Sequence, residues 1–123
     1  MTVIGAGNIG VALVRFRGFG TRGFKVVSIY DNDPYRIGQV WAGLTVRDQK
    51  CLEEDLRGEP VDIAILVTPA EAAQRLADRL VAVGVRAILN FAPVQLRTPE
   101  GVVVKNVNLA LELEALSYGL GNN

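Results

Sequence analysis

Three glycines near the beginning of the chain have the spacing of a turn that can hold phosphate groups. Gly5, Gly7 and Gly10 follow the short apolar segment Thr2–Ile4 and lead into an amphipathic stretch, Asn8–Phe16. In a strand–turn–helix unit the first glycine allows the tight bend, the second lets the backbone approach a pyrophosphate, and the third lets the helix pack against the sheet. The amino end of the helix then offers unpaired N–H groups to the phosphates. The spacing therefore predicts a dinucleotide-binding turn.

An acidic residue stands where the ribose of such a dinucleotide would lie. Asp31 follows a run of β-branched and aromatic residues, Phe24–Tyr30, about 20 positions beyond the last glycine. A carboxylate there can accept hydrogen bonds from both hydroxyls of the adenosine ribose and would repel a 2′-phosphate, so it favours NAD(H) over NADP(H). Arg36 lies close enough in the sequence to weaken that preference.

The same acidic segment has a second, structural interpretation. Asp31, Asn32 and Asp33 precede Pro34 and are residue types typical of turns, and Asp33 is suited to cap a helix. The two interpretations can hold together. We expect Asp31 to contact the ribose and Asn32 to belong to the same site.

A later turn has a similar position relative to its strand. The segment Val61–Val67 is almost continuously apolar, which is typical of a central parallel strand covered on both faces. Thr68 can cap the helix that follows, Pro69 suits its first position, and Glu71 completes a capping box. Because ligands bind at the carboxyl ends of strands in open α/β sheets, the turn Thr68–Ala70 is also a candidate binding site. Capping alone is the alternative.

Asn90 is a polar residue within the apolar segment Ala87–Ala92, which Pro93 closes. Burial of its amide without a partner would cost ~1–3 kcal/mol. Either a ligand amide or a neighbouring turn could satisfy it. The full set of expected cofactor-binding residues is Gly5, Ala6, Gly7, Asn8, Ile9, Gly10, Asp31, Asn32, Thr68, Pro69, Ala70, Asn90, Phe91 and Ala92.

Size and composition restrict the class of protein. With 123 residues, half of them hydrophobic and 21% charged, the chain is expected to be one globular domain, residues 1–123. Thirteen basic and thirteen acidic residues cancel, so the chain has no electrostatic footprint for DNA. Histidine is absent and Cys51 is the single cysteine, which leaves little for metal binding and fits a reducing cytoplasm. No apolar run approaches the ~20 residues of a membrane span.

The remaining patterns predict an alternation of strands and helices. Apolar residues at Ala73, Leu76, Ala77 and Leu80 predict a helix that Gly84 ends. The other expected elements are a short helix at Pro34–Val40, a strand at Leu44–Val46, a helical turn at Leu52–Leu56 and a strand at Val102–Lys105. This order predicts an α/β fold of the Rossmann type, a doubly wound, mostly parallel sheet with helices on both faces.

The last expected helix, Asn106–Tyr118, has two apolar faces. Leu109, Leu113 and Leu116 share one face of a helical wheel, and Leu111, Ala115 and Tyr118 share nearly the opposite one. A surface helix usually has one apolar stripe, so two suggest that the helix is sandwiched. We expect self-association through this helix, with a helix tucked into its own domain as the alternative.

Four motifs together resemble a known family. They are Gly5–Gly10 (GAGNIG), Tyr30–Pro34 (YDNDP), Thr68–Gln74 (TPAEAAQ) and Leu89–Pro93 (LNFAP). The chain resembles the carboxy-terminal NAD(H)-binding domain of the Rex redox-sensing transcriptional repressors, and the match continues to Leu116–Tyr118. The resemblance implies a homodimer with exchanged carboxy-terminal helices, NADH and NAD+ as competing ligands, and a winged-helix domain whose DNA affinity NADH lowers.

Three departures from that family affect the expected function. The chain carries no winged-helix domain, so it is not expected to bind an operator by itself. Phe16 stands where the family usually has a tyrosine, and Asn108 stands where an aspartate usually opens the last helix. The family uses these two positions to connect the nicotinamide site to the DNA-reading domain, so their loss argues against the usual route of redox signalling. The glycines and Asp31 are intact.

These patterns predict an NAD(H)-binding, dimerising sensor domain that is not an enzyme and acts in the cytoplasm. Hydride transfer to a carbonyl normally needs a proton donor, and Lys25, Lys50 and Lys105 show no motif that pairs them with a tyrosine. These observations argue against a small NAD-dependent oxidoreductase, which is one alternative. A stand-alone domain for coenzyme A or another nucleotide is the other, although Asp31 would face the 3′-phosphate that coenzyme A carries on its ribose.

Overall fold

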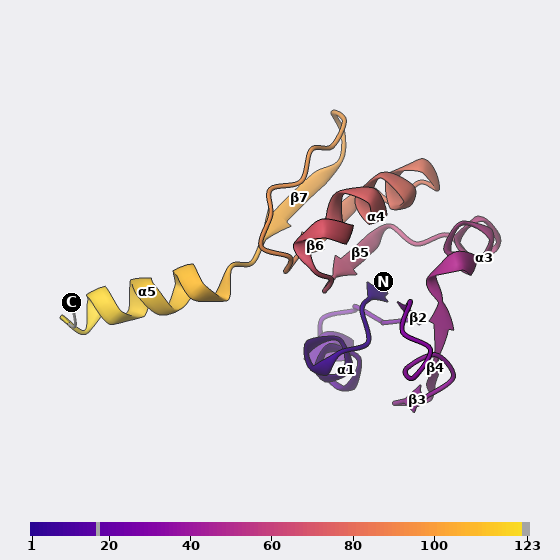
Figure 1. Ribbon diagram of the computed structural model, residues 1–123, viewed down its shortest axis with the longest axis horizontal. Helices are drawn as coiled ribbons and strands as arrows, with labels where there is room; N and C mark the ends of the chain where they lie inside the picture. The colour runs from indigo at the N-terminus through magenta and orange to yellow at the C-terminus, as the bar shows by residue number, and fades with distance from the viewer. Residues whose placement is uncertain (17, 122–123) are drawn as a thin grey trace.

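In the part of the chain that the structure describes, seven strands form one sheet in the order β3-β4-β2-β1-β5-β6-β7. The structure is a computed structural model that describes residues 1–16 and 18–121 (Figure 1). Neighbouring strands are parallel except for the antiparallel pair β3–β4. The strands are β1 (Thr2–Ile4), β2 (Ser28–Asp31), β3 (Val40–Trp41), β4 (Leu44–Asp48), β5 (Ile63–Leu66), β6 (Ala87–Asn90) and β7 (Val103–Asn106).

The strand order reverses at β1, which has β2 on one side and β5 on the other. In open α/β sheets, ligands bind beyond the carboxyl ends of the strands at such a point. The predicted glycine turn follows β1 and therefore occupies this place. The helices are α1 (Asn8–Arg15), α2 (Gly18–Thr21), a 3₁₀ turn (Gln49–Cys51), α3 (Leu52–Gly58), α4 (Ala70–Ala82) and α5 (Leu109–Gly119).

Side chains alternate between the two faces of the sheet, so each face buries its own hydrophobic cluster. Ile4 and Leu66 lie on the face that α3 and α4 cover, whereas Val3 and Ile65 lie on the face that α1 covers (Figure 1). The predicted doubly wound, mostly parallel sheet with helices on both faces is therefore confirmed.

The helix α4 confirms one prediction and corrects another. Its buried residues are Ala73, Leu76, Ala77 and Leu80, the stripe that the sequence predicts. Its N-cap is Pro69, in an extended conformation with φ −59° and ψ 154°, and no side chain caps the helix. The predicted capping box with Thr68 is wrong, because the helix begins one residue too late for the Thr68 hydroxyl to reach its first N–H groups.

The segment Pro34–Val40 is a turn and not the predicted helix. The N–H groups of Arg36 and Ile37 both donate to the carbonyl oxygen of Asp33, at 2.9 and 3.0 Å. Gly38 then has a φ of +91°, which an L-residue rarely adopts, and it ends the turn after one winding. The chain continues into β3, which pairs with β4 as a hairpin.

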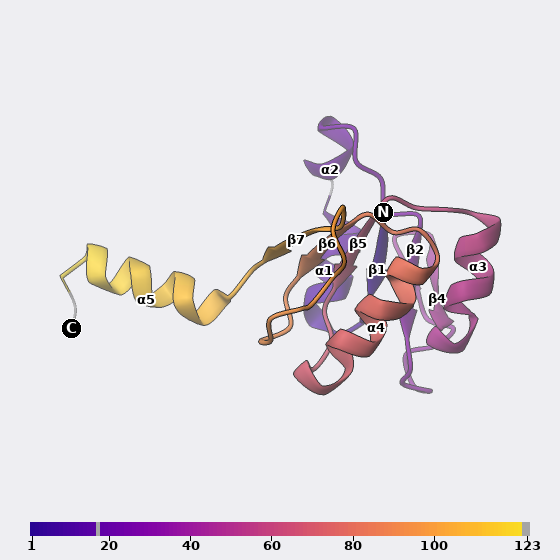
Figure 2. The same ribbon diagram turned by 90° about the horizontal axis from the view of Figure 1, so that it is seen from above.

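The helix α5 extends away from the rest of the chain beyond the edge strand β7 (Figures 1 and 2). It begins at Leu109 instead of Asn106, because Asn106 ends β7 beside Asn90 of β6. Leu113, Leu116 and Tyr118 are exposed. The side chains of Leu109 and Leu111, on the two predicted faces, lie outside the described residues.

Candidate functional site

The glycine turn contains two positions that the fold itself requires and one that it leaves open. Gly5 has a φ of +117°, and a Cβ on it would overlap the carbonyl oxygen of Val67. A Cβ on Gly10 would overlap the carbonyl oxygen of Gly5. A Cβ on Gly7 would have Nη1 of Arg36 as its nearest neighbour, 3.6 Å away. Gly7 thus borders free space, which fits the close approach of a ligand.

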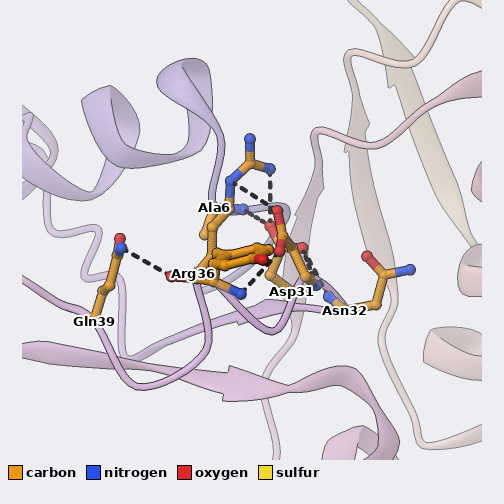
Figure 3. A network of polar contacts seen from close by, with 7 residues as sticks. Ala6, Asp31, Asn32, Arg36 and Gln39 are labelled. Carbon is orange, nitrogen blue, oxygen red and sulfur yellow. Dashed lines mark hydrogen bonds and ion pairs between the residues drawn. The ribbon is translucent and has the colours of Figure 1, made fainter.

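Asp31 connects this turn to the end of β2 (Figure 3). Its Oδ2 accepts a hydrogen bond from the Ala6 N–H at 2.7 Å, and its Oδ1 accepts from the N–H groups of Asn32 and Asp33 at 2.7 and 2.9 Å. Nη1 of Arg36 lies 3.4 Å from Oδ2. A carboxylate has about four lone-pair positions, and these donors occupy them. The sequence predicts two roles for Asp31, contact with the ribose and stabilisation of the turn, and this geometry shows the second. A ribose hydroxyl would have to displace one of these donors to bond to the carboxylate.

Arg36 places a positive charge beside the glycine turn. Its side chain is 45% exposed, and besides the contact to Asp31 its Nε lies 3.8 Å from Oδ2 of Asp33. From its place in the sequence, Arg36 is expected only to modify the cofactor preference. The position of its Nη1, 3.6 Å from where a Cβ on Gly7 would lie, could not be inferred from the sequence. It depends on how the turn after β2 packs against the turn after β1.

A cavity of about 260 Å³ lies between the ends of β2 and β5. Six of the expected cofactor-binding residues line it: Gly5, Gly7, Asp31, Asn32, Thr68 and Pro69. The Thr68 side chain is about nine-tenths buried, and its hydroxyl has no hydrogen-bond partner within the described part of the chain. Because a buried hydroxyl without a partner is unfavourable, this group fits a hydrogen bond to a ligand.

A second cavity, of about 580 Å³, lies on the other side of the glycine turn. Gly7 and Asn8 line it together with two residues that the sequence analysis missed, Arg15 and Trp41. The Arg15 guanidinium stacks over the Trp41 ring, 4.7 Å from its centroid. Arg36 lines both cavities and so stands between them.

Asn90 is completely buried at the end of β6, where the protein itself satisfies its amide. Its Nδ2 lies 2.9 Å from the Val94 carbonyl oxygen, 3.3 Å from that of Ala92 and 3.1 Å from Oδ1 of Asn106. Its Oδ1 accepts the Ala92 N–H at 3.0 Å. A neighbouring turn is thus the partner, the second of the two predicted possibilities.

The other expected residues lie around these cavities without lining them. Ile9 is partly exposed in the first turn of α1, and Phe91 packs against the cluster beneath α1. Gly10, Ala70 and Ala92 also lie outside both cavities. None of the helices in the described residues has the length and apolar character needed to cross a bilayer.

A mostly parallel sheet with a glycine turn at the reversal of its strand order, flanked by two cavities, defines a Rossmann-type nucleotide-binding domain. A family model described as "CoA binding domain" matches residues 1–94. The chain belongs to this CoA binding domain family.

Its curated relatives are redox-sensing transcriptional repressors named Rex. The chain is 45% identical over 118 residues to Rex of Streptomyces coelicolor, covering 96% of this chain and 46% of that protein. It is 44% identical over 119 residues to Rex of Desulfitobacterium hafniense, covering 97% of this chain and 57% of that protein. The chain thus spans about half the length of these relatives. The predicted resemblance to Rex is confirmed, and the relatives are named as repressors and not as enzymes.

Solved structures give the same result. RSP, a Rex-family repressor, in complex with β-NADH matches with a TM-score of 0.91 and 38% identity over 97% of this chain and 57% of that one. RSP in complex with β-NAD+ and operator DNA also has a TM-score of 0.91, with 55% of that chain covered. A UDP-D-quinovosamine 4-dehydrogenase from Vibrio fischeri, 18% identical with a TM-score of 0.59, shares the fold alone.

Proposed function

We propose that this chain is the NAD(H)-binding, dimerising sensor domain, residues 1–123, of a Rex-like redox-responsive transcriptional repressor that acts in the cytoplasm. The observation that carries the proposal is the open Gly7 position between two cavities at the switch point of the sheet. The likeness to RSP, whose structure contains β-NADH, supports the dinucleotide as the ligand.

The expected cofactor-binding residues form three groups, one for each part of the dinucleotide. The pyrophosphate would lie on the glycine turn and the first N–H groups of α1, and the adenosine would lie in the cavity that Asn32 and Thr68 line. The nicotinamide would lie toward the turn after β6, where Phe91 and Ala92 offer apolar side chains. An apolar surface favours the neutral reduced ring over the charged oxidised one, so we expect NADH to bind more tightly than NAD+.

Titration of the purified chain with NADH, NAD+ and coenzyme A tests this proposal. Gly7→Ala should fold normally, because its Cβ meets only the tip of Arg36, but it should weaken NADH binding about tenfold or more by obstructing the phosphates. Gly58→Ala is the matched control, because its Cβ meets no atom within 4 Å. Unfolding midpoints of both variants should be no lower than that of the wild type, because alanine fits the backbone at both positions.

Two results would contradict the proposal. Wild-type protein that does not bind NADH rules out the dinucleotide as its ligand. Coenzyme A binding more tightly than NADH would favour the alternative to which the family description points, a stand-alone domain for coenzyme A.

Dimerisation through α5 is supported by two complementary apolar surfaces. Leu113, Leu116 and Tyr118 are exposed on the projecting helix. A cavity of about 420 Å³, with far more apolar than polar surface, is lined by Phe16, Phe19, Phe24, Ile63, Ile65 and Leu89, among others. The helix of one copy would cover this cavity of the other. Phe16, one of the departures from the Rex pattern, adds apolar surface there.

DNA binding would require a winged-helix domain outside this chain. The chain corresponds to 55% of the RSP chain in the complex with operator DNA, and its formal net charge is +0. A domain without excess positive charge has little electrostatic attraction for DNA. The departures at Phe16 and Asn108 lie along the route that the family is expected to use for signalling.

A further inference from the structure

The Asp31 carboxylate, which is expected to favour NAD(H) over NADP(H), already forms an ion pair with Arg36 in this structure. A carboxylate at the end of β2 discriminates against a ribose 2′-phosphate by electrostatic repulsion. The Asp31 carboxylate accepts three backbone N–H groups and has the Arg36 guanidinium 3.4 Å from Oδ2 (Figure 3). Its side chain is 6% exposed, so a ligand phosphate would meet the arginine before the carboxylate.

The Arg36 guanidinium remains available to a ligand. Its ion pairs to Asp31 and Asp33 are 3.4 and 3.8 Å long, well beyond the 2.7–2.9 Å typical of a strong charge-assisted hydrogen bond. They engage Nη1 and Nε, whereas a guanidinium has five N–H donors. The side chain lines both cavities that flank Gly7.

A second polar group lines the cavity at this end of the site. The Thr68 hydroxyl is buried without a partner in the described residues, and Thr68 and Arg36 line the same cavity of about 260 Å³. A phosphate carries several acceptor oxygens and can bond to a guanidinium and a hydroxyl together. The donors at this end of the site therefore suit a phosphorylated ribose.

We propose that Arg36 is a specificity-determining residue: its guanidinium offsets the Asp31 carboxylate, so the site discriminates only weakly between an adenosine ribose with a free 2′-hydroxyl and one with a 2′-phosphate. This inference rests on the proposed dinucleotide-binding function and defines the cofactor class of that site more closely. It extends the expectation that Arg36 weakens the preference that Asp31 gives for NAD(H).

The test is the ratio of the dissociation constants of NADPH and NADH, measured by titration of the full chain. Arg36→Gln should raise this ratio about tenfold or more, because it removes a positive charge and a charge-assisted hydrogen-bond donor from the neighbourhood of the 2′-phosphate. Arg36→Lys should keep most of the wild-type ratio, because the charge remains. The matched control is Arg86→Gln, at an exposed arginine that immediately precedes β6, and it should leave the ratio unchanged.

The outcomes separate this inference from the proposed function. If Arg36→Gln leaves the ratio unchanged or weakens both ligands equally, or if the wild-type ratio exceeds about 1000 (a discrimination near 4 kcal/mol), the inference is wrong while NADH binding stands. If the wild type binds neither dinucleotide, the proposed function itself fails. Added salt should reduce the effect of Arg36→Gln, because it screens exposed charges.

Discussion

Asn90 connects the turn at residues 91–94, where the nicotinamide is proposed to lie, with the end of β7, which leads into the proposed dimerisation helix α5. Its buried side chain holds the turn at residues 91–94, and its Nδ2 lies 3.1 Å from Asn106, three residues before α5 begins. An amide nitrogen has two hydrogens, yet three acceptors lie within 3.3 Å of Nδ2. The carbonyl oxygens of the turn and the Asn106 side chain therefore compete for the two hydrogens of Nδ2.

The effect of Asn90 on stability can be measured by urea unfolding at pH 7. Asn90→Asp would place a carboxylate oxygen against three acceptor oxygens and leave a buried charge, so it should lower the free energy of unfolding by about 3 kcal/mol or more. Asn106→Ala removes only one bond and should cost about 1 kcal/mol. Equal losses in the two variants would show that the Asn90 amide does not have this central role.

At the scale of elements, an ion pair joins α3 to α4. The Arg79 guanidinium contacts both carboxylate oxygens of Glu53, at 2.6 and 2.7 Å, and also donates to the Gln49 carbonyl oxygen at 2.6 Å. The hydrogen bonds from Arg79 lower the pKa of Glu53 to about 2, from an ordinary value of 4.5. The pair therefore holds the two helices of one sheet face together.

The lowered pKa predicts a pH dependence of stability. The contribution of Glu53 is fully present above its unfolded pKa of 4.5 and is lost as the pH falls toward its folded pKa of about 2. Urea midpoints should fall less in Glu53→Gln than in the wild type between pH values of about 5 and 3. Glu54→Gln, an exposed neighbour on the same helix, should follow the wild-type profile. Identical profiles for all three proteins would contradict this account.

At the scale of the whole molecule, the projecting α5 is the feature on which the proposed dimer rests. Figure 2 shows α5 extending from the sheet beyond β7. Leu113 and Leu116 of this helix are exposed, and Ile63, Ile65 and Leu89 of β5 and β6 line an apolar cavity. Association of two copies through these surfaces would remove both from water, which is favourable in proportion to the apolar area covered.

A dimer of this kind makes thermal stability depend on chain concentration. The wild-type Tm should rise over a roughly hundredfold range of concentration, because mass action stabilises an associated native state. The double variant Leu113→Asp, Leu116→Asp should lower the sedimentation mass to that of a monomer and remove the dependence. Gln95→Asp, an exposed residue on a loop, is the control. A concentration-independent Tm in the wild type would rule out this dimer.

Local sequence patterns determined much of the fold and part of the site. The apolar stripe of α4 follows from a helical period, and the glycine turn after β1 follows from steric requirements of single residues. The helical stripe depends on neighbours within a few positions, and the glycine spacing is a recurrent pattern of the strand–turn–helix unit, so a sequence is sufficient to predict both. The atom that excludes a side chain at Gly5 belongs to Val67 and is known only from the tertiary structure. The helix predicted at Pro34–Val40 failed because Gly38, at a positive φ, ends the winding and β3 pairs with β4.

Only the tertiary structure decided which polar groups meet. The partners of Asp31 include Ala6, 25 residues away, and those of Asn90 include Asn106, 16 residues away. The first contact requires β1 and β2 to lie side by side, and the second requires the register of β6 and β7. Periodicity in the sequence shows that a residue will be buried or will stand at a strand end. It does not show which donor lies opposite, because that depends on distances set by the pairing of whole strands.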